Sequence, residues 1–216
     1  GQLSRFAQHD ALEAYADFVG FCRGYREGHG RDKTGSVWRV QQLNIGSGKD
    51  YRPGWLNVDV LERAEPDLVL DLATPLQLPL AVTTRFGAPV LLEAESLQRI
   101  CASNVLEHVP DLPQLMSNAL ELLAVGGEFE IEVPYEKALT AWQDPTHLRA
   151  MNENSWIYYT QWFWYLGWFT HRFEVAASTW LDAQLQPCTK DTAGFMRVCL
   201  RKVCTTAQER NLARTM

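Results

Sequence analysis

Short apolar runs, separated by residues that favour turns, recur along most of the chain. Runs of this kind, bounded by glycine, proline and aspartate, are typical of strands buried in a sheet. Five of them predict strands at residues 37–45, 55–58, 68–72, 100–103 and 128–133, and two later runs predict strands at residues 173–176 and 195–203. The pattern of strands with intervening helical segments indicates an α/β fold.

Apolar residues at spacings of three and four predict an amphipathic helix at residues 3–22. A polar, glycine-rich connector follows this helix and reaches the first strand. We therefore expect a helix and linker at residues 1–36 that pack on the core. One domain is expected at residues 37–204, and a polar, frayed tail at residues 205–216.

Three further helices are expected inside the domain. Asp111 can cap a helix that ends at Gly126 and Gly127. An aromatic-rich segment predicts a helix at residues 152–165, with most of its rings in the core and one or two facing a cleft. Pro89 is expected to open a short helix that continues to residue 97.

Two segments conflict with a simple parallel sheet. Residues 49–54, between the first two strands, are too few for the helical crossover that parallel strands normally need. In the run at residues 128–133, glutamates alternate with apolar residues, whereas a strand covered on both faces should be apolar throughout. One face of that strand is therefore expected to be thinly covered or to line a site.

Composition narrows the class of protein. The 216 residues are 46% hydrophobic and 21% charged, and the net charge is -6, which argues against broad binding to nucleic-acid backbones. No apolar run approaches the roughly 20 residues that a membrane-spanning helix needs, and no signal segment opens the chain. The five cysteines are scattered without a C-x-x-C pair, which favours reduced thiols and a cytoplasmic location.

Candidate chemistry begins at the turn after the first long strand. Gly46 and Gly48 flank Ser47, and glycines let a backbone approach a ligand closely because no Cβ intervenes. Asp59 ends the next strand, where a carboxylate can accept the hydroxyls of a ribose. The arrangement predicts a nucleotide-like cofactor site.

The order of motifs resembles the class I S-adenosylmethionine-dependent methyltransferases. Residues 44–48 (Asn-Ile-Gly-Ser-Gly) are similar to the first motif of that family, without its third glycine. The Leu-Glu-His of residues 106–108 and the Gly-Gly of residues 126–127 resemble its small-molecule branch, and residues 53–59 and 144–147 resemble a bacterial subgroup linked to sugars and surface polymers. The resemblance implies a Rossmann-like sheet of seven strands in the order 3-2-1-4-5-7-6, with strand 7 antiparallel and helices on both faces.

The resemblance also implies the residues that hold the cofactor, S-adenosylmethionine. Asp59 would accept the ribose hydroxyls and Asp71 the adenine amino group, although each carboxylate can equally serve a turn or a helix cap. The full set implied is Asn44, Gly46, Ser47, Gly48, Asp59, Asp71, Leu72 and Asn104. Asn104 can equally cap the turn that follows it.

Methyl transfer from a sulfonium requires positioning of the acceptor and, for some acceptors, removal of a proton. His147, beside Asp144, is the leading candidate base, because imidazole titrates near neutral pH. The alternative is that Asp144 forms a local turn and His147 packs or hydrogen-bonds nearby. His108 is a second candidate base, and no spacing of His, Cys and Asp matches a closed metal site.

The acceptor is expected to be a small molecule or a glycan, methylated on oxygen or nitrogen. The alternatives are a cofactor-binding or regulatory protein of the same fold without activity, and an enzyme with a protein or nucleic-acid acceptor. The Asn/Asp-Pro-Pro-aromatic motif of base-methylating enzymes is missing after the fourth strand, where the chain reads Asn104-Val105-Leu106-Glu107. Nucleic acid is therefore disfavoured as an acceptor.

Overall fold

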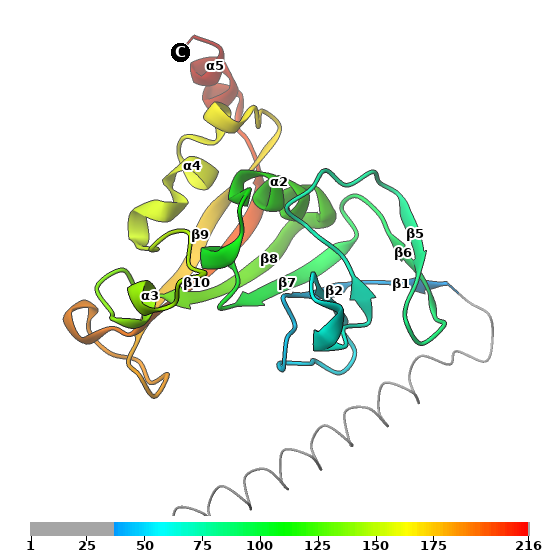
Figure 1. Ribbon diagram of the computed structural model, residues 1–216. Helices are drawn as coiled ribbons and strands as arrows, with labels where there is room; N and C mark the ends of the chain where they lie inside the picture. The colour runs from blue at the N-terminus through cyan, green and yellow to red at the C-terminus, as the bar shows by residue number, and fades with distance from the viewer. Residues whose placement is uncertain (1–36, 216) are drawn as a thin grey trace, which may run out of the picture.

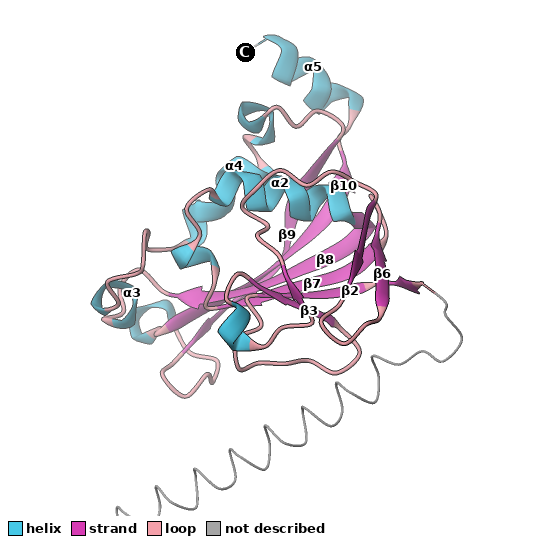
Figure 2. Cartoon of the chain, turned by 45° about the vertical axis from the view of Figure 1, so that its right-hand side comes forward, coloured by secondary structure: helices cyan, strands magenta, loops and turns pink. Residues whose placement is uncertain are grey.

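A computed structural model describes residues 37–215. The expected helix at residues 3–22, its connector and their packing on the core lie outside the described residues. Seven strands form the main sheet (Figures 1 and 2). In spatial order they are β4 (Leu68–Val69), β3 (Leu56–Asp59), β2 (Gln42–Ile45), β7 (Leu97–Ser103), β8 (Leu123–Pro134), β10 (Phe195–Cys204) and β9 (His171–Leu181).

Numbered along the chain, these strands follow the predicted order 3-2-1-4-5-7-6. The strand β10 runs antiparallel to both of its neighbours, and the other pairings are parallel. The α/β fold class expected from the motif order is confirmed. In the part of the chain that the structure describes, no helix is long and apolar enough to cross a bilayer.

The helices α2 (Leu112–Leu122) and α4 (Ile157–Thr160) lie over one face of the sheet (Figure 2). The Asp111 carboxylate accepts the backbone N–H of Gln114, which confirms the predicted cap. The apolar side of α2 belongs to the same buried cluster as alternate residues of β8, namely Phe129, Ile131 and Val133. Removing this apolar area from water is the main stabilising term of the domain.

The predicted end of this helix is wrong by several residues. The helix α2 ends at Leu122, and Gly126 and Gly127 lie inside β8. Gly126 has φ +86°, and a Cβ on Gly127 would lie 2.9 Å from the carbonyl oxygen of Ala124. The two glycines therefore allow the irregular start of β8 and do not cap α2.

Other predicted helices are broken, replaced or gained. The aromatic segment forms η3 (Glu153–Trp156), α4 and η4 (Phe163–Leu166), and α3 (Thr140–Gln143) precedes it. The described part of the tail forms α5 (Ala207–Thr215) and not a frayed end, and Glu209 of this helix pairs with Arg172 of β9. The remaining short helices are η1 (Glu62–Ala64), η2 (Leu106–His108) and η5 (Lys190–Thr192).

The predicted helix after Pro89 is wrong, because this segment is a strand. The strands β5 (Leu80–Thr83) and β6 (Pro89–Leu92) form a hairpin, and β6 also pairs in parallel with β1 (Trp38–Arg39). Val90 and Leu92 are buried, whereas their neighbours are half-buried, so the segment has the period of two that a strand requires. This hairpin replaces the helical crossover between β4 and β7.

No helix lies between β2 and β3, as the short crossover predicted. A buried network ties the loop to the sheet instead. The Asn57 side chain accepts from the backbone N–H of Arg52 and donates to the Arg52 and Trp55 carbonyls and to Asp67. Because one amide satisfies several buried backbone groups, the loop is fixed without a helix.

The β8 glutamates alternate out of the core, as expected for a thinly covered face. Glu132 forms an ion pair with Arg197, and Glu128 forms one with Arg201 at 2.9 Å. Both arginine side chains are about half exposed. Ion pairs with such exposed arginines contribute little to stability.

Candidate functional site

The glycine loop follows β2 at the carboxyl edge of the sheet, where ligands bind in open α/β folds. Gly46 has φ +61° and Gly48 has φ +43°, conformations that side chains rarely adopt. The two glycines differ in what surrounds them. A Cβ on Gly46 would lie 2.4 Å from Cγ2 of Val105, whereas the nearest atom to a Cβ on Gly48 is the Gly46 carbonyl oxygen at 3.7 Å.

The contact with Val105 explains why residue 46 is glycine without reference to a ligand. Val105 follows β7 and begins the segment that carries Glu107 and His108. The glycine loop and that segment are therefore packed directly on each other. Gly48 remains the position at which a ligand can approach the backbone.

The Asp59 carboxylate lies against the same loop, and its residue is 8% exposed. One oxygen accepts the backbone N–H of Gly48 and the other accepts that of Leu61, both at 2.9 Å. Asp59 thus fixes the loop in this structure. Each carboxylate oxygen can accept further hydrogen bonds, so the residue can also meet a polar ligand.

The Ser47 side chain is buried, and its hydroxyl has no hydrogen-bond partner among the described residues. A buried hydroxyl without a partner costs free energy, and such groups in a native fold are commonly explained by a function. The Ser47 hydroxyl, the open backbone at Gly48 and the spare lone pairs of Asp59 form a set that fits a polar, nucleotide-like ligand.

Asn44 lies apart from this set. Its amide donates to the Asp50 carbonyl at 2.6 Å and to Asn57 at 2.9 Å, and its oxygen accepts from the Cys101 thiol. The residue is 2% exposed. Its side chain is therefore used within the fold, and the geometry does not support the cofactor contact implied for it.

The three remaining residues implied for the cofactor have different environments. Asp71 is exposed, and its carboxylate accepts the backbone N–H of Ala73 in a local turn. The Leu72 side chain is buried in the core, and its carbonyl accepts from Asn118. Asn104 is exposed with φ +53°, directly after β7, so it lies at the carboxyl edge.

A second cluster of polar side chains lies where η2 meets the segment after α3. One oxygen of Glu107 and one ring nitrogen each from His108 and His147 lie within 4.8 Å of one another. His147 Nε2 is 4.0 Å from Glu107 Oε1 and also 4.0 Å from Asp144 Oδ2. The fold therefore brings both candidate histidines and Asp144 to one place.

Hydrogen bonds to the other ring nitrogens fix how these histidines face the cluster. His147 Nδ1 lies 3.0 Å from the Ala141 carbonyl oxygen, so that nitrogen carries the proton. His108 Nδ1 lies 3.0 Å from the Thr146 hydroxyl, which itself donates to Asp144 at 2.6 Å. The hydroxyl proton is thus used, and His108 Nδ1 donates. In the neutral form of each ring, Nε2 is then the nitrogen with the lone pair.

The local alternative for Asp144 is also present, because its carboxylate accepts the Thr146 backbone N–H in a tight turn. The Thr146 hydroxyl and backbone N–H both lower the pKa of Asp144 from its ordinary value. Glu107 behaves in the opposite way. Burial raises its pKa, and neither of its oxygens has a hydrogen-bond partner among the described residues.

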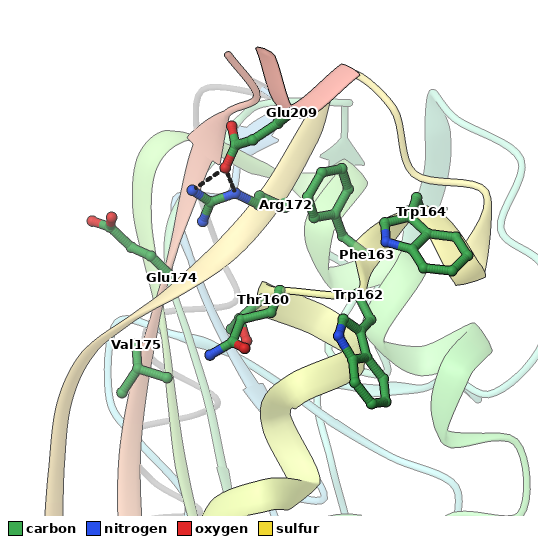
Figure 3. A pocket seen from close by; sticks show the side chains of 9 residues that line it. Thr160, Trp162, Phe163, Trp164, Arg172, Glu174, Val175 and Glu209 are labelled. Carbon is green, nitrogen blue, oxygen red and sulfur yellow. Dashed lines mark hydrogen bonds and ion pairs between the residues drawn. The ribbon is translucent and has the colours of Figure 1, made fainter. Parts of the chain in front are cut away.

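The aromatic segment contributes to a cavity elsewhere. A cavity of about 500 Å³ lies between η4, the start of β9 and α5, and includes Trp162, Phe163, Arg172 and Glu209 (Figure 3). In Figure 3 the paired side chains of Arg172 and Glu209 point toward each other. The strands β9 and β8 run in the same direction, so this cavity lies near the amino edge of the sheet, opposite the glycine loop.

The sequence did not single out two features of the site. Ser47 was expected only as part of a glycine motif, although its buried hydroxyl is the clearest unfilled group there. Glu107 was recognised as part of a motif without a role, yet it is 1% exposed at the centre of the histidine cluster. A charged residue directly after a buried strand was the available signal for Glu107.

Comparison with known proteins places the fold. No protein-family model matches the sequence, and a comparison with curated proteins gives no match. A chain of a Haloferax volcanii complex between the Trm112 methyltransferase activator and a methyltransferase is similar in structure. It is 15% identical with a TM-score of 0.50, over 87% of this chain and 95% of that one.

Two further solved structures are similar at lower scores. An S-adenosylmethionine-dependent methyltransferase from Mesorhizobium loti is 14% identical with a TM-score of 0.46, over 76% of this chain and 92% of its own. One from Archaeoglobus fulgidus is 14% identical with a TM-score of 0.44, over 85% and 99%. At these identities likeness extends to the fold alone. With the strand order and the Haloferax volcanii match, the chain has the fold of the class I S-adenosylmethionine-dependent methyltransferases.

Proposed function

We propose that this chain transfers a methyl group from S-adenosylmethionine to an oxygen or nitrogen of a small molecule or glycan. The observation that carries the proposal is the meeting of two polar clusters at the carboxyl edge of a methyltransferase-like sheet. One is the glycine loop with the unpartnered Ser47 hydroxyl. The other is the cluster of Glu107, His108 and His147, joined to the loop through the contact between Val105 and Gly46.

The residues that would hold the cofactor are those of the loop and of the neighbouring strand ends. The backbone of Gly46, Ser47 and Gly48 would lie against the polar part of the cofactor. The Asp59 carboxylate would accept hydrogen bonds from its ribose hydroxyls. Asp71, Leu72 and Asn104 remain candidates for the adenine end on the strength of the family resemblance. When bound, the cofactor supplies a methyl group already activated on a sulfonium.

The chain's own task is then to position the acceptor and take up a proton. His147 is the candidate proton acceptor, because its Nδ1–H is held by Ala141 and its Nε2 lone pair is free. Asp144 and Glu107 lie 4.0 Å from that nitrogen and would stabilise the imidazolium that forms. A cytoplasmic location, predicted from the cysteine pattern, belongs to the same proposal.

Calorimetry with S-adenosylmethionine and S-adenosylhomocysteine tests the cofactor. The Ser47→Ala variant should bind either ligand about 3–10-fold more weakly, since one hydrogen bond is lost, while its free energy of unfolding is unchanged or higher. Ser178→Ala, an exposed serine of β9, is the matched control. Absence of binding at millimolar ligand contradicts the proposal.

Methyl transfer itself is tested with labelled cofactor and a panel of glycan and small-molecule acceptors. His147→Ala should reduce turnover, with cofactor affinity kept. Cofactor binding without transfer to any acceptor favours the second candidate, a cofactor-binding protein without activity. The missing third glycine and the hairpin of β5 and β6 in place of a helical crossover are the observations that favour it. Methyl transfer to a protein or nucleic acid, with none to the small molecules or glycans, would contradict the proposed acceptor class.

A further inference from the structure

We propose that Glu107, His108 and His147 bind a divalent transition-metal ion, with Asp144 as a further ligand. This site does not depend on the proposed methyl transfer, because it follows from the cluster alone. Two imidazoles and a carboxylate are the donors that Zn²⁺, Fe²⁺, Mn²⁺ and Co²⁺ accept, and a set of this composition leaves positions open for water or substrate.

The first argument is the direction of the ring nitrogens. A histidine ligand binds a metal through one nitrogen while its other N–H is usually held by a carbonyl, a carboxylate or water. His147 is held in this way by the Ala141 carbonyl, and His108 by the Thr146 hydroxyl. In its neutral form each ring is then left with a lone pair on Nε2, through which it can bind an ion.

The second argument is Glu107, which is 1% exposed and whose two oxygens have no hydrogen-bond partner among the residues that the structure describes. A buried carboxylate without partners is costly, and its neighbours here offer lone pairs and not protons. The Asp144 carboxylate and the Glu107 carboxylate both converge at 4.0 Å on His147 Nε2. A cation between these groups would satisfy all of them at once.

The distances are close to those of a bound ion. Ligands at about 2.0–2.2 Å from a tetrahedral Zn²⁺ lie about 3.4 Å from one another. The donors here lie within 4.8 Å of one another, so small side-chain rotations would bring them to that separation. The spacing along the chain, with Glu107 and His108 about forty residues before His147, explains why no sequence motif revealed the site.

The two segments that carry the ligands are held together independently of an ion. The backbone N–H of Leu148 donates to the Glu107 carbonyl at 2.8 Å, and the Arg149 guanidinium donates to the Leu106 and Val109 carbonyls. The ligand set is thus largely pre-organised, which lowers the cost of binding. With an ion bound, the Nε2 lone pair of His147 is used for the ion, so His147 would then be a ligand and not the proton acceptor, and the ion would lower the pKa of an acceptor hydroxyl bound to it.

The test uses the full chain without an affinity tag, stripped with a chelator and titrated calorimetrically with ZnCl₂ and MnCl₂. We expect one ion per chain, and at least a 100-fold weaker affinity in Glu107→Gln and in His147→Gln. His171→Gln is the matched control, because His171 also lies beside a glutamate, Glu95 at 3.6 Å, but outside this cluster. It should bind the ion as the unchanged chain does.

Several outcomes would overturn the site. These are absence of binding at millimolar ion, more than one weak ion without loss in either variant, and equal loss in the His171 control. Circular dichroism of each variant checks folding, and His108→Gln provides a third ligand variant if one of the others fails to fold. Because no cofactor or acceptor is present in this titration, a failure of methyl transfer leaves its result unaffected, and the reverse also holds.

Discussion

The contact between Gly46 and Val105 can be tested by adding a single methyl group. Replacing Gly46 by Ala places a Cβ 2.4 Å from Val105 Cγ2, far inside van der Waals contact, at a residue with φ +61°. Replacing Gly48 by Ala adds the same methyl at φ +43°, but its nearest neighbour is 3.7 Å away. The two variants therefore separate backbone strain from steric overlap.

The expected magnitudes follow from these two contributions. A non-glycine residue in the left-handed region costs about 1–2 kcal/mol, which both variants share. Overpacking adds about 1–3 kcal/mol to Gly46→Ala alone. We expect Gly46→Ala to lower the free energy of unfolding by about 2–5 kcal/mol and Gly48→Ala by about 1–2 kcal/mol. Val105→Ala in the Gly46→Ala background removes the overlapping methyls and should recover about 1–3 kcal/mol as a coupling energy.

Urea unfolding followed by tryptophan fluorescence and by far-ultraviolet circular dichroism measures five proteins: the unchanged chain, Gly46→Ala, Gly48→Ala, Val105→Ala and the double variant. Coincident transitions justify the two-state treatment. The reasoning is refuted if Gly46→Ala and Gly48→Ala are equally stable, or if the effects of Gly46→Ala and Val105→Ala simply add. In either case packing against Val105 does not explain the glycine at position 46.

Three further perturbations test the energetics of the fold. In the presence of a chelator, Glu107→Gln should be more stable than the unchanged chain at pH 7 by about 1–3 kcal/mol. Because burial raises the pKa of Glu107, the unchanged chain loses stability as pH rises above the ordinary pKa of glutamate. Urea unfolding at a series of pH values should therefore show the difference vanish below pH about 4. Asn57→Ala should cost about 2–4 kcal/mol by breaking the loop network, whereas exposed Asn154→Ala should change little, and equal effects would contradict the network. Lys202→Ala removes the buried hydrogen bond to the Leu123 carbonyl and should cost at least about 2 kcal/mol in thermal unfolding. Arg197→Ala should cost less than about 1 kcal/mol, and the reverse order would contradict the assigned burial.

The sheet was predictable because each main strand carries its own signal. Apolar runs ending in Gly46, Asp59 and Ser103 lie in the order that the family resemblance implies, and parallel neighbours follow from it. The hairpin at residues 80–92 was only half predictable. A proline that can open a helix can also open a strand, and the alternating burial of Val90 and Leu92 appears only once β1 lies beside them.

The site was less predictable than the sheet, for a physical reason. A motif reports which residues are adjacent in sequence, whereas Asn44 and Ser47 differ in which side of the strand end they face. Asn44 points to the loop network and is satisfied there, and Ser47 is buried without a partner. The family motif contains both residues and cannot distinguish them. Burial and hydrogen bonding assign the Asn44 side chain to the fold, whereas the contact of Ser47 with a ligand stays a proposal.

The same distinction changes the meaning of the glycine at position 46. A glycine in a cofactor motif is commonly attributed to the approach of the ligand, but here the closest atoms belong to Val105. Two residues after Val105 is Glu107, whose carboxylate faces the histidines. Because Gly46 has no Cβ, the segment that carries the histidine cluster can pack closely on the glycine loop. A side chain at this position would overlap Val105, which lies two residues before the buried Glu107 carboxylate.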